Sequence, residues 1–408
     1  MFESKWLIVP VAALALLLLS IGVTRDYRLK HEDNNAMHAT FAHNHLEAGM
    51  AATRLHDALI NTKNGRLAFY AHHPPGCGLV LAGVFAITGD DRPMIVRGVA
   101  IAATLLTLVA LWWLVRREEG AAAGLVAATA IAVLPQAAFY GRMVNHEVLA
   151  LPAIIVMVDR YFATACGGGW RTATGLAVAA TVGALLAWVT FFALAACGVH
   201  AVLSIRRPRL YPAAGRALVL LTFLGTSLFA VDVAHIALVR GGDLSDLGGI
   251  FSRRLGSGLN YGAIEWTRKM FGFSRRLASL SGTVALVWLA VRVVRGLMRK
   301  VQLRPIEEIY SVFLTAGVGY VVMFNWGAWQ HHYWQFPLLP AVAIALALAV
   351  TALGRGAITG PRRTASRVVL ALVVIEVVAT SAVGLYARHT TPEDRVIEAV
   401  ETFRSRRL

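Results

Sequence analysis

Residues 31–89 read HEDNNAMHATFAHNHLEAGMAATRLHDALINTKNGRLAFYAHHPPGCGLVLAGVFAITG, the one long, polar and histidine-rich stretch in a chain made mostly of apolar runs. Near its centre, apolar residues recur at helical spacing on one face, and polar residues fall largely on the others. The apolar set is Ala42, Leu46, Ala48, Gly49 and Met50, and the polar set is His43, His45, Glu47 and Arg54. This pattern predicts an amphipathic helix lying along a membrane surface.

The composition of the whole chain excludes a soluble globular protein. Of its 408 residues, 57% are hydrophobic and only 15% are charged, and the mean hydropathy is +0.61. The net charge of +16 comes mainly from arginines in short loops between apolar runs, where positive charge sets membrane orientation. Membrane lipids are therefore expected partners, and no nucleic acid is.

The apolar runs predict an all-α polytopic membrane protein with about 11 transmembrane helices. Residues 172–205 are too long an apolar run for one crossing, so we expect two short helices that turn near Trp188. The predicted spans are residues 6–23, 98–115, 121–139, 143–158, the pair within 172–205, 217–238, 277–294, 309–325, 336–353 and 368–386.

Orientation depends on residues 76–88, an apolar run that is short for a crossing. If this run crossed the membrane, all the arginine-rich loops would lie outside, against the positive-inside bias. We therefore predict a re-entrant or surface-lying element on the outer face and a cytoplasmic N-terminus. The tail, residues 392–408, places Val396, Ile397, Val400 and Phe403 on one helical face and predicts a short outer surface helix.

This map divides the chain into two regions. Residues 1–240 are predicted to form one transmembrane module that includes a large outer loop, residues 25–97. Residues 241–408 form a C-terminal transmembrane region with an outer loop at 239–276. Most histidines and several carboxylates fall in outer loops or at outer helix ends, and ionisable groups there usually face a wet cavity. The sequence thus predicts a cavity that opens outward.

Three motifs carry a resemblance to a known family. Asp33 is followed by Asn44-x-Leu46-x-x-Gly49 and by Thr53-Arg54, and His73-Pro74-Pro75 precedes the next apolar run. This order resembles the first outer loop of the integral-membrane glycosyltransferases that use polyprenyl-phosphate sugars, the superfamily of protein O-mannosyltransferases and lipid A aminoarabinose transferases. The likeness covers the first 150 or so residues well and the rest mainly by hydropathy. It implies the glycosyltransferase-C fold.

The resemblance implies a catalytic acid at Asp33 or at its neighbour Glu32. Many relatives carry two adjacent acids with Glu second, whereas Asn34 follows Asp33 here, so the choice between the two stays open. We favour Asp33. The alternative from the residues alone is a solvated loop acid.

Other residues match positions where the family contacts its substrate. For the arginines, interface snorkelling or a local salt bridge is the structural alternative, and for the aromatic loop it is a membrane-interface belt. The candidate substrate-binding residues are His72, His73, Arg97, Arg142, Glu147, His331, His332 and Tyr333. A cationic stretch in the second outer loop is a further candidate for phosphate capture: Arg253, Arg254, Arg268, Lys269, Arg275 and Arg276.

Cofactor motifs are sparse. The three cysteines, Cys77, Cys166 and Cys197, lie far apart in sequence and predict neither a disulfide framework nor a cysteine-based zinc site. No His-Glu-x-x-His spacing occurs, and a divalent metal ion stays an open alternative. The glycine runs lack the context of a nucleotide loop, which disfavours a nucleotide-sugar donor.

The sequence as a whole predicts an inverting glycosyltransferase, a hexosyl- or pentosyltransferase. It would move a sugar from a polyprenyl-phosphate donor to a cell-envelope lipid, glycan or protein acceptor. The expected location is the outer face of a bacterial plasma membrane. The alternative is a secondary transporter or flippase of lipid-linked or anionic solutes. The sugar, the acceptor and the oligomeric state do not follow from the sequence.

Overall fold

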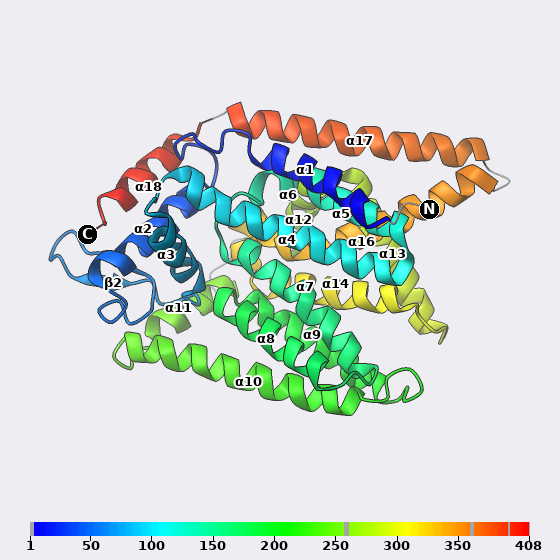
Figure 1. Cartoon of the computed structure of the whole chain (residues 1–408), viewed down its shortest axis with the longest axis horizontal. Coiled ribbons are helices and arrows are strands. Elements are labelled where there is room, and N and C mark those ends of the chain that lie inside the picture. The colour runs from blue at the N-terminus through cyan, green and yellow to red at the C-terminus, as the bar shows by residue number, and fades with distance from the viewer. Residues whose placement is uncertain (1–3, 257–260, 360–362, 391, 408) are drawn as a thin grey trace.

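The computed structural model describes residues 4–256, 261–359, 363–390 and 392–407, and these are mostly helical. Long helices run side by side along the long axis of the molecule (Figure 1). The elements of the first half are η1 (Ser4–Leu7), α1 (Ile8–Leu19), α2 (Asp33–Ala48), β1 (Ala58–Ile60), β2 (Leu67–Phe69), α3 (Gly76–Thr88), α4 (Pro93–Glu119), α5 (Ala121–Val133), α6 (Pro135–Tyr140), α7 (His146–Ala165), α8 (Trp170–Leu186) and α9 (Val189–Ser204).

The second half continues the bundle. Its elements are α10 (Ala214–Val239), α11 (Ser245–Arg254), α12 (Ala263–Leu277), α13 (Ser279–Met298), α14 (Pro305–Met323), α15 (Asn325–Gln330), η2 (His332–Leu338), α16 (Leu339–Thr359), α17 (Arg363–Thr390) and α18 (Asp394–Arg404). One buried apolar core draws on both predicted regions of the chain, from Leu81 and Leu108 to Phe313 and Val400. The division near residue 240 is therefore not a division of the core.

The predicted all-α membrane fold is confirmed. Among the described residues, seven helices are long and apolar enough to cross a membrane: α4, α7, α10, α13, α14, η2 with α16, and α17. The eleven predicted spans are these together with the shorter apolar helices α1, α5, α8 and α9, and that total stays a prediction. The expected break in residues 172–205 lies at Ala187 and Trp188, between α8 and α9.

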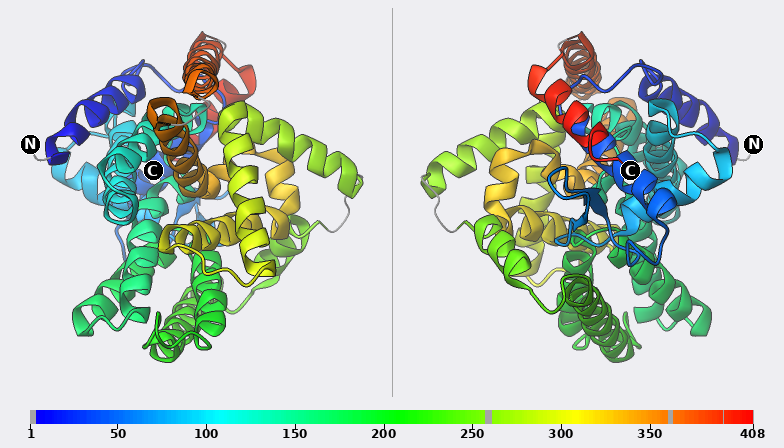
Figure 2. Two further views of the ribbon diagram at one scale, coloured as in Figure 1. Left: turned by 90° about the vertical axis from the view of Figure 1, so that its right-hand side faces the viewer. Right: turned by 90° about the vertical axis from the view of Figure 1, so that its left-hand side faces the viewer.

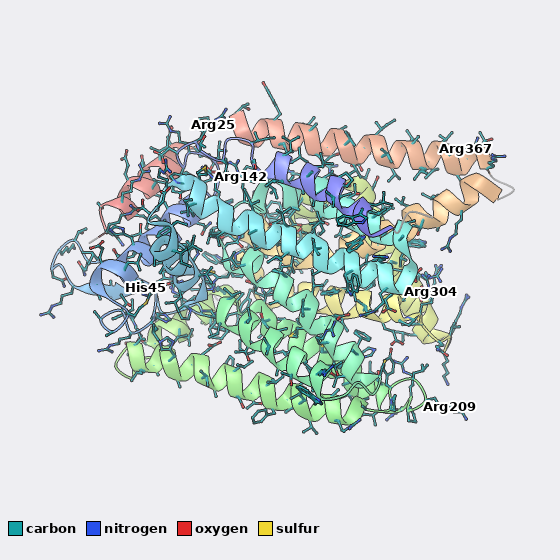
Figure 3. The ribbon with its side chains drawn as sticks, in the orientation of Figure 1. Arg25, His45, Arg142, Arg209, Arg304 and Arg367 are labelled. Atoms are coloured by element: carbon teal, nitrogen blue, oxygen red, sulfur yellow. The ribbon has the colours of Figure 1, made fainter. Side chains whose placement is uncertain are left out.

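The two ends of the bundle differ in chemistry. Figure 3 shows Arg209, Arg304 and Arg367 at one end and His45, Arg142 and Arg25 toward the other. The second end also carries α2, α3 and the two-stranded hairpin β1–β2 (Figure 1). Residues 76–88 form one 13-residue helix there, α3, which packs against α2 and α4. Gly76 allows this packing, because a Cβ at that position would lie 2.3 Å from the carbonyl oxygen of Leu185.

The helix predicted around residues 42–54 ends at Ala48, the last residue of α2, and contact of its apolar face with a membrane surface stays a prediction. Within α2, Asn44 and His45 are buried, whereas Leu46 is 41% exposed and Met50, just beyond the helix, is 36% exposed. The polar side chains turn inward because protein groups satisfy them. His45 Nδ1 lies 2.7 Å from Thr53 Oγ1, and Asn44 donates hydrogen bonds to the carbonyl oxygens of Ala58 and Arg406.

The tail forms the predicted short helix, α18, and this helix covers α2 (Figure 2, right). Val396 and Val400 are buried on its inner face. Thr40 of α2 donates a hydrogen bond to the carbonyl oxygen of Phe403, and Ile60 of β1 donates one to that of Arg406. The apolar face of the tail thus packs on protein.

Candidate functional site

A polar cavity of about 230 Å³ opens where α2, the hairpin, α7, α11 and η2 converge. Its walls combine carboxylates, imidazoles, an arginine and aromatic rings. The lining residues are His31, Asp33, Asn34, Met37, His38, Tyr70, His73, Asn145, His146, Glu147, Arg254, His331, Tyr333 and Trp334. Residues far apart in the sequence therefore share one site.

Asp33 is the first residue of α2, and its half-buried carboxylate faces this cavity. Burial raises the pKa of Asp33 above its ordinary value, an effect that hydrogen bonds from backbone N–H groups at the start of the helix partly offset. The raised pKa makes the Asp33 carboxylate a better proton acceptor than an ordinary aspartate.

Glu32 is placed differently, although it precedes Asp33 in the chain. It is 3% exposed and does not line the cavity. Arg97 Nη2 and Arg142 Nη2 donate to its Oε1 at 2.8 and 2.9 Å, and the backbone N–H groups of Arg28 and Leu29 donate to its Oε2 at 3.1 Å. Both oxygens are already engaged as acceptors, so Glu32 anchors the start of α2.

Arg97 and Arg142 do not line this cavity, and their contact with substrate stays a prediction. Both are buried against Glu32, and Arg97 also donates to the carbonyl oxygens of Val23 and Arg25 at 2.8 and 2.5 Å. This is the local salt bridge that the sequence left as the alternative. Burial of two cations with one carboxylate is stable only while all three are present.

His73 and Glu147 do line the cavity, as the resemblance implied. Arg254 Nη2 donates to His73 Nε2 at 2.8 Å, and the Arg254 guanidinium lies 5.2 Å from the Trp334 ring centre. Glu147 accepts a hydrogen bond from the Tyr320 hydroxyl at 2.7 Å. Burial, followed by the charges of His146 and Arg254, lowers the pKa of His73 well below its ordinary value, which keeps the imidazole neutral.

The remaining predicted residues fall into two groups, those that line the cavity and those that lie beside it. His331 and Tyr333 line the cavity, and burial lowers the pKa of His331 to about 4. His332 instead contacts the Tyr140 hydroxyl at 2.5 Å through Nδ1. His72 is half-buried outside the lining, and its carbonyl oxygen accepts a hydrogen bond from Trp188 Nε1. His72 and His332 therefore flank the site.

The sequence did not single out several lining residues, among them His31, Met37, His38, Tyr70 and Trp334. The one partial signal was for Arg254, which belongs to the cationic stretch of the second outer loop. Its five companions do not line the cavity. Nothing in the local pattern distinguishes Arg254 from Arg253, because α11 brings only one of them over Trp334.

Comparison with known proteins assigns the fold. Residues 72–230 match the family of dolichyl-phosphate-mannose-protein mannosyltransferases. The whole chain is similar to ArnT from Cupriavidus metallidurans bound to undecaprenyl phosphate (TM-score 0.60, 14% identity, 99% of this chain and 79% of that one). It is also similar to the oligosaccharyltransferase AglB from Archaeoglobus fulgidus in complex with an inhibitory peptide and a dolichol-phosphate (TM-score 0.58, 12% identity, 96% of this chain).

This chain spans 57% of the length of AglB. No curated protein matches the sequence. The predicted resemblance to the polyprenyl-phosphate-dependent glycosyltransferases is confirmed by the family match and by the fold.

Proposed function

We propose that this protein is an inverting glycosyltransferase that moves a sugar from a polyprenyl-phosphate donor to a hydroxyl of a cell-envelope lipid, glycan or protein. The observation that carries the proposal is the placement of Asp33 and Arg254 on the walls of one polar cavity. The family match and the shared fold favour a transferase over the transporter alternative. The names of the similar structures, which include undecaprenyl phosphate and dolichol-phosphate, support a lipid-linked donor.

The reaction assigns a role to each side chain. The acceptor oxygen attacks the anomeric carbon from the face opposite the phosphate, and its proton passes to the Asp33 carboxylate. The bond between the anomeric carbon and the phosphate oxygen breaks, and the phosphate leaves with the electron pair. Arg254, held by His73 and Trp334, would stabilise the negative charge that develops on the phosphate.

Location is part of the proposal. The end of the bundle that carries the cavity also carries α2 and the hairpin, and Arg209, Arg304 and Arg367 lie at the other end (Figure 3). The positive-inside bias would leave those arginines in the cytoplasm. The cavity would then open on the outer face of a bacterial plasma membrane.

The test is transfer by the purified full chain in detergent. We expect turnover of a polyprenyl-phosphate sugar and none of a nucleotide sugar without lipid. Asp33→Asn keeps the shape of the side chain and loses the proton acceptor, so turnover should fall about a hundredfold to ten-thousandfold, while donor binding is retained. Glu47→Gln, at an exposed position on the same helix, is the matched control and should retain activity.

Efficient transfer from a nucleotide sugar in the absence of lipid would overturn the donor assignment. Activity of Asp33→Asn within a fewfold of the wild type would remove Asp33 from its role as the base.

A further inference from the structure

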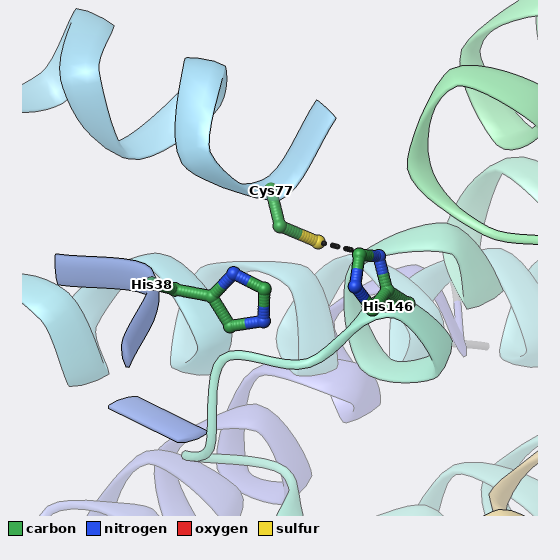
Figure 4. Close-up of side chains that lie close together, drawn as sticks. All are labelled: His38, Cys77 and His146. Atoms are coloured by element: carbon green, nitrogen blue, oxygen red, sulfur yellow. Dashed lines mark hydrogen bonds between the residues drawn. The ribbon is translucent and has the colours of Figure 1, made fainter. Parts of the chain in front are cut away.

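Three buried donor side chains from three helices meet beside the cavity: His38 of α2, Cys77 of α3 and His146 of α7 (Figure 4). The sulfur and one ring nitrogen of each histidine all lie within 4.8 Å of one another. The three residues are 1%, 0% and 6% exposed. Both histidines also line the cavity, whereas Cys77 does not.

Hydrogen bonding leaves lone pairs in this cluster without a donor. His146 Nδ1 lies 2.8 Å from the carbonyl oxygen of Leu186 and 3.4 Å from Cys77 Sγ, the contact drawn as a dashed line in Figure 4. The carbonyl oxygen can only accept, so Nδ1 carries the proton and Nε2 carries a lone pair. That Nε2 is buried and has no hydrogen-bond partner within the described part of the chain, and the same holds for Nδ1 of His38. Buried polar atoms normally have partners, so a ligand bound between these side chains would supply the partner that the two nitrogens lack.

Neighbouring groups hold the imidazole rings in orientations that can bind a cation. The His73 ring stacks on His146 with centres 4.1 Å apart and planes 8° apart. The bond from His146 Nδ1 to Leu186 is of the kind that orients a histidine ligand from outside the coordination sphere.

We propose that His38, Cys77 and His146 bind a divalent cation of the zinc type, with a fourth coordination position that faces the cavity. Sulfur and imidazole donors suit zinc better than magnesium or calcium. Tetrahedral zinc holds nitrogen and sulfur ligands roughly 3.5 Å apart, so binding would draw these side chains closer together. The Cys77 thiol would lose its proton to solvent as it binds the metal.

This inference goes beyond the proposed transfer reaction, because metal binding needs neither a donor nor an acceptor. The cysteine spacing implied no cysteine-based zinc site, although the sequence left a divalent metal ion as an open alternative. The ligands are 39 and 69 residues apart in the chain, so no local motif marks them. Three protein ligands with one open position are typical of zinc that contacts a substrate or water.

The test is metal binding by the purified full chain after treatment with a chelator. Titration with Co²⁺ should reach one ion per chain and give a thiolate-to-cobalt charge-transfer band, which Zn²⁺ should displace. Cys77→Ser should remove the band and weaken binding at least about a hundredfold. Cys197→Ser replaces another fully buried thiol, in α9, and should change neither result.

A second measurement uses the wild-type chain and so does not depend on the folding of a variant. Alkylation of Cys77, followed by peptide mass spectrometry, should slow when Zn²⁺ is added, while alkylation of Cys166, an exposed cysteine, serves as the internal reference. No stoichiometric Co²⁺ binding, or a band that persists in Cys77→Ser, would overturn the inference. Transfer without metal binding would refute only this inference, and metal binding without transfer would refute only the proposed function.

Discussion

Two neighbouring acids at the start of α2 have opposite surroundings. Glu32 points into a buried ion cluster with Arg97 and Arg142, and Asp33 faces the cavity. Adjacent residues at a helix start project in different directions, so a shift of one position changes a structural anchor into a group that can contact substrate. The choice that the sequence left open is thus one of side-chain direction.

The ion cluster predicts the effect of Glu32→Gln on stability. Removing this charge leaves two buried guanidinium groups without a carboxylate, and breaking a buried ion pair typically costs about 3–5 kcal/mol. We expect a clearly lower apparent Tm in detergent for Glu32→Gln and an apparent Tm near that of the wild type for Asp33→Asn. An inactive Glu32→Gln protein that is as stable as the wild type would instead identify Glu32 as the base.

The pKa of Asp33 predicts the acid limb of the activity profile. Because burial raises this pKa, the carboxylate takes up its proton at a higher pH than an ordinary aspartate, whose value is 3.8. Protonation removes the base, so kcat/KM should fall as pH decreases through the raised pKa. A profile of kcat/KM against pH measures this directly, and activity that stays level down to pH 3.8 would contradict it.

At the scale of elements, α18 serves as a cover for α2. Its buried residues Val396 and Val400 face α2, and hydrogen bonds join its C-terminal end to Thr40, Asn44 and Ile60. The helix that bears Asp33 is therefore held from both sides, by α3 and by α18. This arrangement would keep the cavity wall rigid.

We predict that Val400→Asp undocks α18, because an unpaired carboxylate would be buried against α2. Limited proteolysis should then remove the tail faster than in the wild type, and the apparent Tm should fall. The control is Glu398→Asp, at an exposed position of the same helix. Equal rates of cleavage in Val400→Asp and the wild type would show that the docking contributes little.

At the scale of the whole molecule, the prediction concerns orientation. In a background with Cys166, an exposed cysteine, replaced by serine, Lys63→Cys in the hairpin loop should react with an impermeant thiol reagent in intact cells. Arg209→Cys, at an exposed position of the opposite end (Figure 3), should react only after the cells are opened. Labelling of the Arg209 site alone in intact cells would reverse the proposed orientation. The sequence suggests two further positions for cysteine labelling, Gly258 on the outer side and Gly360 on the inner side. Both lie outside the described residues.

The sequence by itself determined the class of fold, because apolar runs of membrane-spanning length leave the backbone few alternatives to helix. It also placed the turn near Trp188 and marked residues 76–88 as an apolar run short for a crossing, which forms the single helix α3. These features depend on composition and on spacing along the chain. They can be predicted without knowing which helices pack against one another.

Only the tertiary structure decided which side chains share the cavity. Asp33, His73, Glu147, Arg254 and Tyr333 come from five separate segments, and the direction of each depends on partners that no local pattern specifies. The inward polar face of α2 follows from contacts with the hairpin and α18, whereas hydrophobic periodicity assumes that polar residues face water. That assumption fails where buried polar side chains have hydrogen-bond partners. The site could therefore be identified only from the three-dimensional structure.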